Sequence, residues 1–211
     1  MVARARDLVE PLVRPDARVI VAIAGPPGAG KSTLAEALVA AFDDELSTGP
    51  GEPGAVAVPM DGFHLSNAEL RRLGLANRKG ALPTFDGAGF VRLLERIAAR
   101  EDLVYAPAYS RVVHESIGGV IPVFASTRLV VTEGNYLLVP EPPWSRARPL
   151  YDLAIYLDMA EGPRVEGLIA RQRSFGLDEE AARDWVYRSD EDNARLVATT
   201  RPYADVVLHR D

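Results

Sequence analysis

Residues 25–33 constrain the fold of this 211-residue chain more than any other stretch. They read Gly-Pro-Pro-Gly-Ala-Gly-Lys-Ser-Thr and fit the pattern G-x-x-x-x-G-K-[ST] without a mismatch. An apolar run at 18–24 precedes the motif, and a helical pattern at 33–42 follows it. A strand that passes through a glycine-rich loop into a helix forms a phosphate-binding loop, so we predict that the chain binds a nucleoside triphosphate.

Each position of this loop has a chemical reason. Glycines allow successive backbone N–H groups to turn toward an anion, because a Cβ would block that conformation. Lys31, one of only two lysines beside 22 arginines, supplies a compact charge to the β and γ phosphates, and the Ser32 hydroxyl is placed to bind Mg²⁺. The residues that we expect to contact the nucleotide here are Gly25, Gly28, Ala29, Gly30, Lys31, Ser32 and Thr33.

The composition excludes several other classes of protein. A formal net charge of -6 argues against a nucleic-acid partner, and the lack of cysteine excludes disulfides and thiolate metal sites. The three histidines, His64, His114 and His209, are too few and too scattered for a histidine-based metal site. No apolar run approaches the length of a membrane span, and residues 1–13 read as a short amphipathic helix and not as a signal peptide. We therefore expect a cytoplasmic protein that does not engage a membrane.

Strand-like runs alternate with helical runs along the chain, which is typical of a parallel sheet between helices. This order predicts one α/β domain over residues 1–211, a three-layer sandwich with a mostly parallel sheet and helices on both faces. Residues 105–124 contain β-branched side chains and two prolines and predict a small antiparallel excursion. The other expected strands are 18–24, 55–60, 128–134, 153–158 and 203–208, and the expected helices are 33–42, 67–73, 86–100, 162–173 and 178–198, the last with a break near 189–190.

Two expected strands end in acidic residues, and ligands of open α/β sheets bind outside the carboxyl ends of the strands. Asp61 follows the second strand and is well placed to accept a proton from an acceptor hydroxyl. Its alternative role is to cap the next helix, although Ser66 suits that cap better. Glu133 closes an apolar strand, as the acidic residue of a Walker B motif does, and could hold Mg²⁺. A polar strand end that faces solvent is the alternative for Glu133.

Two arginines, Arg171 and Arg173, come at the end of an expected helix, and residues 171–178 are expected to form a mobile lid. Because Gln172 separates them, the two guanidinium groups lie on different faces of a helical turn. Such arginines can fold over a triphosphate and stabilise charge in the transition state. The alternative is favourable charge at a helix end that Gly176 caps, and both roles can hold together.

Several segments, taken in their order and spacing, resemble the successive motifs of type I pantothenate kinases and uridine kinases, in the superfamily that includes phosphoribulokinase. The similarity covers about residues 18–208. It implies an ATP- and Mg²⁺-dependent phosphotransferase that moves the γ-phosphoryl group to a hydroxyl of a small molecule. The segments that carry the resemblance are 60–64, 78–80, 84–86, 106–110, 132–136 and 200–207.

The resemblance also implies roles for individual residues. Asp61 matches the catalytic aspartate of the family, and Glu133 matches the acidic residue at the end of its Walker B strand. Arg171 and Arg173 match the lid arginines. With Lys31, these four residues form the implied catalytic set.

On the acceptor side, Asp86 matches an aspartate that in uridine kinases accepts hydrogen bonds from ribose hydroxyls. Lys79 matches a substrate-side lysine of pantothenate kinases. Tyr109 lies in a substrate-side motif, and His114 falls where uridine kinases place a histidine that contacts the base. The alternative for Lys79 is a solvated lysine in a loop. The alternative for His114 is a half-buried residue in a strand. Arg201 lies in the segment that resembles the C-terminal part of uridine kinases, and we assign it to the nucleotide.

The chain departs from both families at the acceptor site. Arg111 stands where pantothenate kinases have a histidine, Gly62 replaces a serine of uridine kinases, and residues 86–88 read Asp-Gly-Ala in place of Asp-His-Pro. A guanidinium beside an acceptor site suits a carboxylate or phosphate, so Arg111 favours a hydroxylated acid or sugar derivative over a neutral nucleoside. The alternative is a surface arginine on an edge strand.

The sequence thus favours a kinase that uses ATP and Mg²⁺ and acts on a nucleoside, a pantothenate-like molecule, a sugar or a hydroxy acid. One alternative is an ATP-hydrolysing switch or assembly factor without a small-molecule acceptor, and another is a degenerate nucleotide-binding module. The polar cluster on the acceptor side favours the kinase, because a switch has no need of a pocket that reads hydroxyls. A homodimer is left open.

Overall fold

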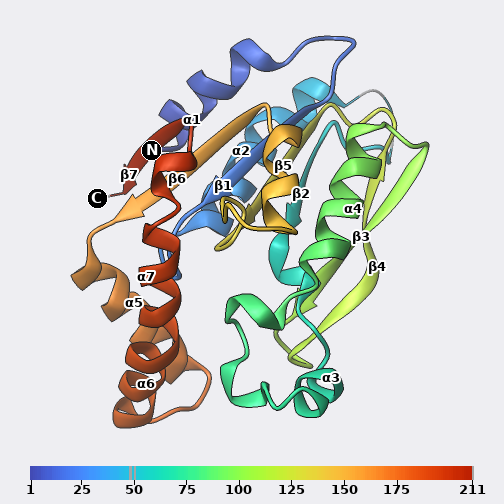
Figure 1. The fold of residues 1–211 in the computed structure, drawn as a ribbon. Coiled ribbons are helices and arrows are strands. Elements are labelled where there is room, and N and C mark those ends of the chain that lie inside the picture. The colour runs from blue at the N-terminus through green and yellow to red at the C-terminus, as the bar shows by residue number, and fades with distance from the viewer. Residues whose placement is uncertain (48, 50, 211) are drawn as a thin grey trace.

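The computed structural model describes residues 1–47, 49 and 51–210, and five parallel strands form its central sheet (Figure 1). The strand order is β2-β5-β1-β6-β7, so β1, which leads into the phosphate-binding loop, is the middle strand. The expected α/β fold with a parallel sheet is confirmed. The strands are β1 (Val19–Ala24), β2 (Ala55–Pro59), β5 (Leu129–Gly134), β6 (Leu153–Met159) and β7 (Val206–Arg210).

Helices cover both faces of this sheet, because alternate side chains of a strand point in opposite directions. Ile23 of β1 packs toward α1 (Val2–Val9) and α2 (Lys31–Leu46). Ile20 of β1 belongs to the cluster on the opposite face, which includes the buried side of α4 (Gly87–Ala98). With both faces covered, every residue of β1 and β5 is buried, which explains their nearly continuous apolar runs.

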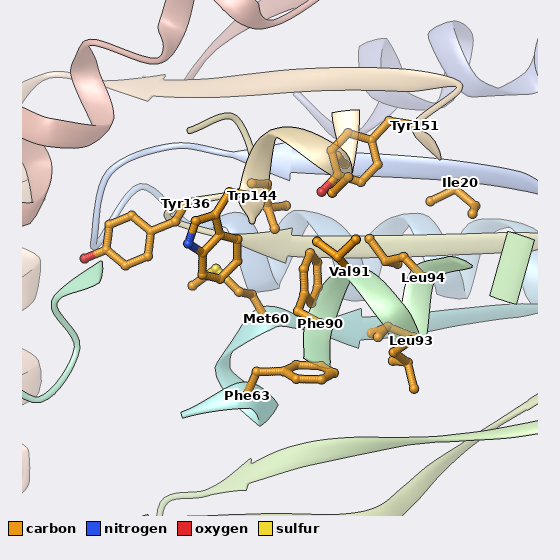
Figure 2. Close-up of a cluster of buried hydrophobic side chains, with 14 of the residues drawn as sticks. Ile20, Met60, Phe63, Phe90, Val91, Leu93, Leu94, Tyr136, Trp144 and Tyr151 are labelled. Atoms are coloured by element: carbon orange, nitrogen blue, oxygen red, sulfur yellow. The ribbon is translucent and has the colours of Figure 1, made fainter. Parts of the chain in front are cut away.

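Aromatic side chains dominate the cluster that contains α4 (Figure 2). The ring of Phe90 on α4 lies edge to face with Phe63 at a centroid distance of 5.3 Å, and 5.7 Å from Trp144. Phe63 ends the 3-10 turn η2 (Met60–Phe63), and Tyr136 follows β5 and approaches Trp144 at 6.2 Å. Packing in this cluster therefore fixes the two segments that follow β2 and β5.

The expected antiparallel excursion is confirmed as a two-stranded sheet of β3 (Leu103–Ser110) and β4 (Glu115–Phe124). Buried residues of both strands, including Val104 and Val123, join the same core cluster as α4. The strand β3 also packs against η2. The hairpin is thereby held beside the turn that contains Asp61.

The α-helices that follow β6 in the described part of the chain are α5 (Glu161–Ser174), α6 (Glu179–Trp185) and α7 (Glu191–Ala198). The expected break near 189–190 is a π-helical segment, η7 (Val186–Asp190), between α6 and α7. Figure 1 shows these segments on one side of the molecule and α3 (Asn67–Arg72) with the hairpin on the other.

Two differences from the sequence expectations concern the last strand and the first helix after the phosphate-binding loop. The last strand begins at Val206 and not at 203, because residues Arg201–Tyr203 form a 3-10 turn with proline in its first positions. The helix after the phosphate-binding loop continues to Leu46. The expected surface loop at 47–54 includes positions 48 and 50, which lie outside the described residues. Within the described residues, no helix combines the length and the apolar character needed to cross a membrane.

Candidate functional site

The phosphate-binding loop has the backbone that only glycine adopts without strain. Gly25 has a φ of +153° and Gly30 a φ of +93°. A Cβ on Gly25 would lie 2.4 Å from the backbone oxygen of Leu157 on β6, and one on Gly30 would lie 2.0 Å from Nη1 of Arg210 on β7. At Gly25 glycine is therefore required for space as well as for conformation, because the backbone of β6 cannot move aside. At Gly30 the end of the Arg210 side chain can move, so the positive φ is the reason for glycine.

Lys31 begins α2 and is only 7 % exposed. Its Nζ donates to the backbone oxygen of Pro26 at 2.9 Å and to Oδ1 of Asn135 at 2.8 Å. Burial lowers the pKa of Lys31 to about 8, although the charges of Glu133 and Asp61 act in the opposite direction. The ammonium group is thus held inside the loop by neutral acceptors that a phosphate could replace. The sequence pattern did not single out Asn135 as a site residue, although it lies in segment 132–136, which resembles the kinases.

Ser32 and Glu133 meet at the carboxyl edge of the sheet. Ser32 Oγ donates to Oε1 of Glu133 at 2.9 Å, and Glu133 is 8 % exposed. Glu133 lies beside Ile23 of β1 and Pro59 of β2 in the strand register. Burial raises the pKa of the Glu133 carboxyl, the charge of Lys31 lowers it, and the charge of Asp61 raises it further. A hydroxyl and a carboxylate at this distance form a pair of hard oxygen ligands.

Asp61 lies in η2, directly after β2. The next helix, α3, is capped by Ser66, whose side chain accepts from the backbone N–H of Glu69 at 3.2 Å. Ser66 therefore performs the capping role that was the alternative for Asp61. The backbone oxygen of Asp61 accepts from Nδ1 of His64 at 2.8 Å. This hydrogen bond uses the main chain of Asp61 and leaves its carboxylate available to the cavity described below.

Gly62 explains one departure from uridine kinases. A Cβ at this position would lie 2.2 Å from the backbone oxygen of Pro107 on β3. A serine would therefore push β3 away from η2. The absence of a side chain allows the hairpin to approach Asp61 closely.

A cavity of about 200 Å³ lies between the start of α2, the ends of β2 and β5, and the hairpin. It brings together five residues that sequence reasoning assigned to phosphate, metal and acceptor binding. Arg111 is among them, and its charge acts on Glu133 and on Tyr109. The lining residues are Ser32, Ala35, Glu36, Ala57, Pro59, Asp61, Ala108, Tyr109, Arg111 and Glu133.

The other acceptor-side residues lie outside the lining of this cavity. Asp86 caps α4, with its Oδ1 accepting from the backbone N–H of Gly89 at 2.8 Å, and its side chain is exposed. His114 is exposed and has a φ of +53° in the turn of the hairpin. The sequence placed both residues on the acceptor side but could not show how far they lie from Asp61.

Lys79 connects the acceptor-side loop to the hairpin. Its Nζ donates to Oδ1 of Asn67 at 2.6 Å and to the backbone oxygen of His114. The same ammonium lies 5.2 Å from the centroid of the Tyr109 ring. Lys79 therefore positions Tyr109, a residue of the cavity lining, and burial lowers the pKa of Lys79.

Both lid arginines lie in the last turn of α5, which Gly176 ends with a φ of +98°. Arg173 approaches Glu179 at 3.8 Å, whereas the charge of Arg171 acts on Lys31 in the phosphate-binding loop. Only Arg173 approaches an acidic side chain within the described residues, and the placement of the two guanidinium groups on different faces stays a prediction. The backbone N–H of Gly176 donates to the oxygen of Arg173 at 2.9 Å, so the helix cap is present too.

Arg201 lies near a second cavity, of about 380 Å³, beside the other end of the phosphate-binding loop. Its Nη2 lies 3.4 Å from Oδ2 of Asp158, which lines that cavity. Arg210, which also lines it, donates to the backbone oxygen of Ala29 at 3.3 Å. The full lining is Asp158, Met159, Ala160, Pro163, His209 and Arg210.

One buried ion pair was missed by sequence reasoning. Arg164 of α5 donates to Oε1 of Glu191 on α7 at 2.6 Å and to the backbone oxygen of Pro27 at 3.2 Å. Both charged side chains are more than 90 % buried. Because Pro27 belongs to the phosphate-binding loop, this arginine connects the loop to α5 and α7. An arginine and a glutamate 27 residues apart carry no local signal of such a pair.

Comparisons with known proteins find relatives along nearly the whole chain. Residues 20–211 match the model of the "Phosphoribulokinase / Uridine kinase family". The chain is 35% identical over 208 residues to the Schizosaccharomyces pombe protein C227.14, named as a proposed uridine kinase, covering 94% of this chain and 86% of that protein. It is 28% identical over 227 residues to the pantothenate kinase of Mycolicibacterium gilvum, covering 97% and 71%.

A solved structure shows the same fold. A protein of Silicibacter sp. TM1040, described as a proposed fructose transport system kinase, superimposes with a TM-score of 0.87 at 35% identity. The match covers 99% of this chain and 98% of that one. The names of these three proteins all contain the word kinase, but each name refers to a different small molecule.

Proposed function

Because the chain belongs to the phosphoribulokinase and uridine kinase family, we propose that it transfers the γ-phosphoryl group of ATP to a hydroxyl of a small metabolite. The observation that supports this most is the cavity of about 200 Å³. One wall of it belongs to the start of α2 and the other to the hairpin. A phosphoryl donor and a hydroxyl acceptor could meet there.

The chain's own residues supply positioning and charge, which is what phosphoryl transfer chiefly requires. Lys31 is held by two neutral oxygens, at 2.9 and 2.8 Å, and exchanges them for phosphate oxygens. Arg171 adds a second positive charge from the lid. Both stabilise the negative charge that spreads over the transferred group.

Asp61 is the proposed general base. Its carboxylate lines the cavity together with Tyr109 and Arg111, so it can accept the proton of an acceptor hydroxyl. Glu133 is less suited to this role because its Oε1 already accepts from Ser32. Lys79 and Tyr109 shape the acceptor side, and Asp86 and His114 could reach only those parts of a larger acceptor that extend beyond the cavity.

The donor set fits Mg²⁺. Within the described residues no group of three or more His, Cys, Asp and Glu side chains could hold a metal. A magnesium ion bound with a nucleotide needs only one or two protein oxygens, because phosphates and water provide the rest. Ser32 and Glu133 would hold it, and when bound it would neutralise charge on the β and γ phosphates.

The second cavity suits the rest of the nucleotide. It lies beside the phosphate-binding loop and is lined by Asp158 and Arg210, which is hydrogen-bonded to that loop. Its volume, about 380 Å³, is sufficient for a nucleobase. Arg201 would act here through its contact with Asp158.

Arg111 supports an acceptor with a negative charge. It lines the same cavity as Asp61, where a guanidinium can bind a carboxylate or phosphate through two hydrogen bonds. We therefore favour a hydroxy acid or a charged sugar derivative among the acceptors, with a pantothenate-like molecule and a nucleoside as the other classes.

The test is ADP release coupled to a second enzyme, measured with Mg²⁺ and ATP. The rate without an acceptor is compared with the rate in the presence of nucleosides, sugars, glycerate and pantothenate. Stimulation by one class, with formation of its phosphate ester, supports the kinase. If ATP is hydrolysed at a steady rate that none of these acceptors changes, an ATP-hydrolysing switch or assembly factor is favoured instead.

A further inference from the structure

The helical segment that follows the lid contains a buried carboxylate oxygen without a hydrogen-bond partner in the described part of the chain. Oδ2 of Asp190 is buried and has no hydrogen-bond partner within the described part of the chain. Asp190 is the last residue of η7, the π-helical segment between α6 and α7. Single π-helical turns are frequent at functional sites, and a buried carboxylate without a partner costs folding free energy. Such a residue indicates a role that the protein alone does not complete.

The lid contains an arginine without an ion pair. Arg164 pairs with Glu191 and Arg173 approaches Glu179, whereas Arg171 has no acidic partner among the residues that the structure describes. Arg164 and Arg171 are seven residues apart, so they lie on the same face of α5. Because Arg164 contacts the phosphate-binding loop, this face of α5 is the one directed toward the nucleotide.

The two unsatisfied groups lie on elements that share a small core. Leu168 of α5, Ala182 of α6 and Val186 of η7 belong to one buried cluster, and η7 packs against α5. A helical side chain leans toward the N-terminus of its helix, which directs Arg171 back toward the level of Asp190. The charge of Arg171 acts on Asp190 and on Lys31 alike. Lys31 and Arg164 act on Asp190 too, so Asp190, Arg171 and the phosphate-binding loop lie near enough for their charges to interact.

We infer that Asp190 is a positioning residue that receives the guanidinium of Arg171 when the nucleotide is bound and holds it against the phosphates. A guanidinium has five N–H donors, so Arg171 can bind a phosphate and a carboxylate at once. The triphosphate attracts Arg171 into the site, and Oδ2 of Asp190 gains the partner that it lacks. This inference rests on the proposed function, because it requires a bound nucleoside triphosphate.

Asp190→Asn tests the inference, with Asp192→Asn as the matched control. Asp192 lies two residues away, is exposed and pairs with Arg195 on its own helix. Binding of the magnesium complex of the β,γ-imido analogue of ATP is measured by titration calorimetry. Since a charge-assisted hydrogen bond is lost, we expect Asp190→Asn to bind the analogue roughly 10-fold more weakly, whereas Asp192→Asn should match the parent protein.

The direction of this change is informative. If Asp190 acts only through its negative charge, that charge repels the triphosphate. Its removal in Asp190→Asn would then make the analogue bind more tightly. Tighter or unchanged binding in Asp190→Asn would therefore overturn the inference. Asp190→Glu restores the carboxylate and should recover part of the affinity, whereas a purely structural site would not tolerate the longer side chain better than the amide.

A double variant shows whether Asp190 acts through Arg171. If it does, Asp190→Asn should weaken analogue binding no further in a protein that already carries Arg171→Gln. Additive losses, or a loss confined to the KM of the acceptor, would contradict the inference and assign Asp190 to another partner. If the parent protein itself does not bind the analogue, the proposed function fails and the inference fails with it.

Thermal unfolding without nucleotide separates positioning from folding. Because Asp190 carries an unsatisfied, buried carboxylate, Asp190→Asn should unfold at the same temperature as the parent protein or higher. A clearly lower unfolding temperature, with affinity lost only in proportion to the unfolded fraction, would show that Asp190 supports the fold and would overturn the inference.

Discussion

The phosphate side of the site and the lid differ in how their charges are satisfied. On the phosphate side, Lys31 donates to Pro26 and Asn135, and Ser32 donates to Glu133. On the lid and the helical segment after it, Arg171 and Oδ2 of Asp190 lack partners within the described residues. The phosphate side is therefore preorganised, whereas the lid retains groups that a ligand can satisfy.

Burial explains the difference between the basic side chains, Lys31 and Arg171, whereas Oδ2 of Asp190 is buried and is the exception. Lys31 and Glu133 are both less than 10 % exposed, and an unpaired charge there would cost several kcal/mol. The side chains of Arg171 and its neighbours at the end of α5 are exposed, so water compensates them at little cost. Such a site can bind the nucleotide first on its preorganised side. Arg171 and Asp190 then gain their partners afterwards. The following predictions test this contrast.

The largest effect is expected on the preorganised side. Lys31→Ala should reduce phosphoryl transfer by roughly 10³-fold, because it removes charge stabilisation that acts on the transition state. The fold should persist, since the substitution also removes a desolvated ammonium group. Turnover is measured by coupled ADP release and folding by circular dichroism. Turnover within tenfold of the parent protein would refute the assignment of this loop.

Asp61→Asn should lower kcat by roughly 10²-fold, the scale of a lost general base, while ATP binding stays unchanged. The amide keeps the shape of the side chain but cannot accept the acceptor's proton. Steady-state kinetics at saturating acceptor, together with analogue binding, check this. If kcat is retained and only the acceptor KM rises, Asp61 binds the acceptor, and Glu133 becomes the candidate base.

Arg111→Gln should raise the KM of an anionic acceptor roughly 10-fold without changing the affinity for ATP, because one charge-assisted hydrogen bond is lost. His114→Asn is the control in the same turn, since His114 does not line the cavity and asparagine tolerates its positive φ. KM values for both variants are compared. An equal effect of the two substitutions would contradict the placement of Arg111 at the acceptor.

An effect of similar size is expected from pH. Burial lowers the pKa of Lys31 to about 8 from its ordinary 10.5, and bound phosphates should raise it again. Nucleotide binding should therefore take up a proton near this pH, and affinity should fall roughly tenfold from about pH 7 to about pH 9. Titration calorimetry in buffers of different ionisation enthalpy measures the uptake. Affinity that does not change across this range would show that Lys31 stays charged without the nucleotide.

The same shift has a consequence for stability. The pKa of Lys31 is lower in the folded protein than in the unfolded chain, so the unfolded chain binds more protons between about pH 8 and 10.5. The free energy of unfolding should therefore gain from Lys31 as pH rises through this window. The gain should be absent in Lys31→Ala, as denaturant unfolding at two pH values can show.

Most of the fold could be predicted from the sequence because its elements carry local signals. The alternation of apolar strands and amphipathic helices gave the parallel sheet, and the glycines at 118 and 119 with the β-branched residues around them marked the antiparallel hairpin. The start of β7 was misplaced by three residues, since an apolar pattern does not reveal that Arg201–Tyr203 turns as a 3-10 helix.

The chain's sequence alone determined the phosphate side, because residues 25–33 are contiguous and glycine geometry and a helix start act over a few residues. Only the tertiary structure showed that Arg111 shares a cavity with Asp61 and that Asn135 accepts from Lys31. It also revealed the pairing of Arg164 with Glu191 and the unsatisfied Asp190. These relations join residues that are distant in the chain, and packing between elements, not local propensity, decides which of them meet.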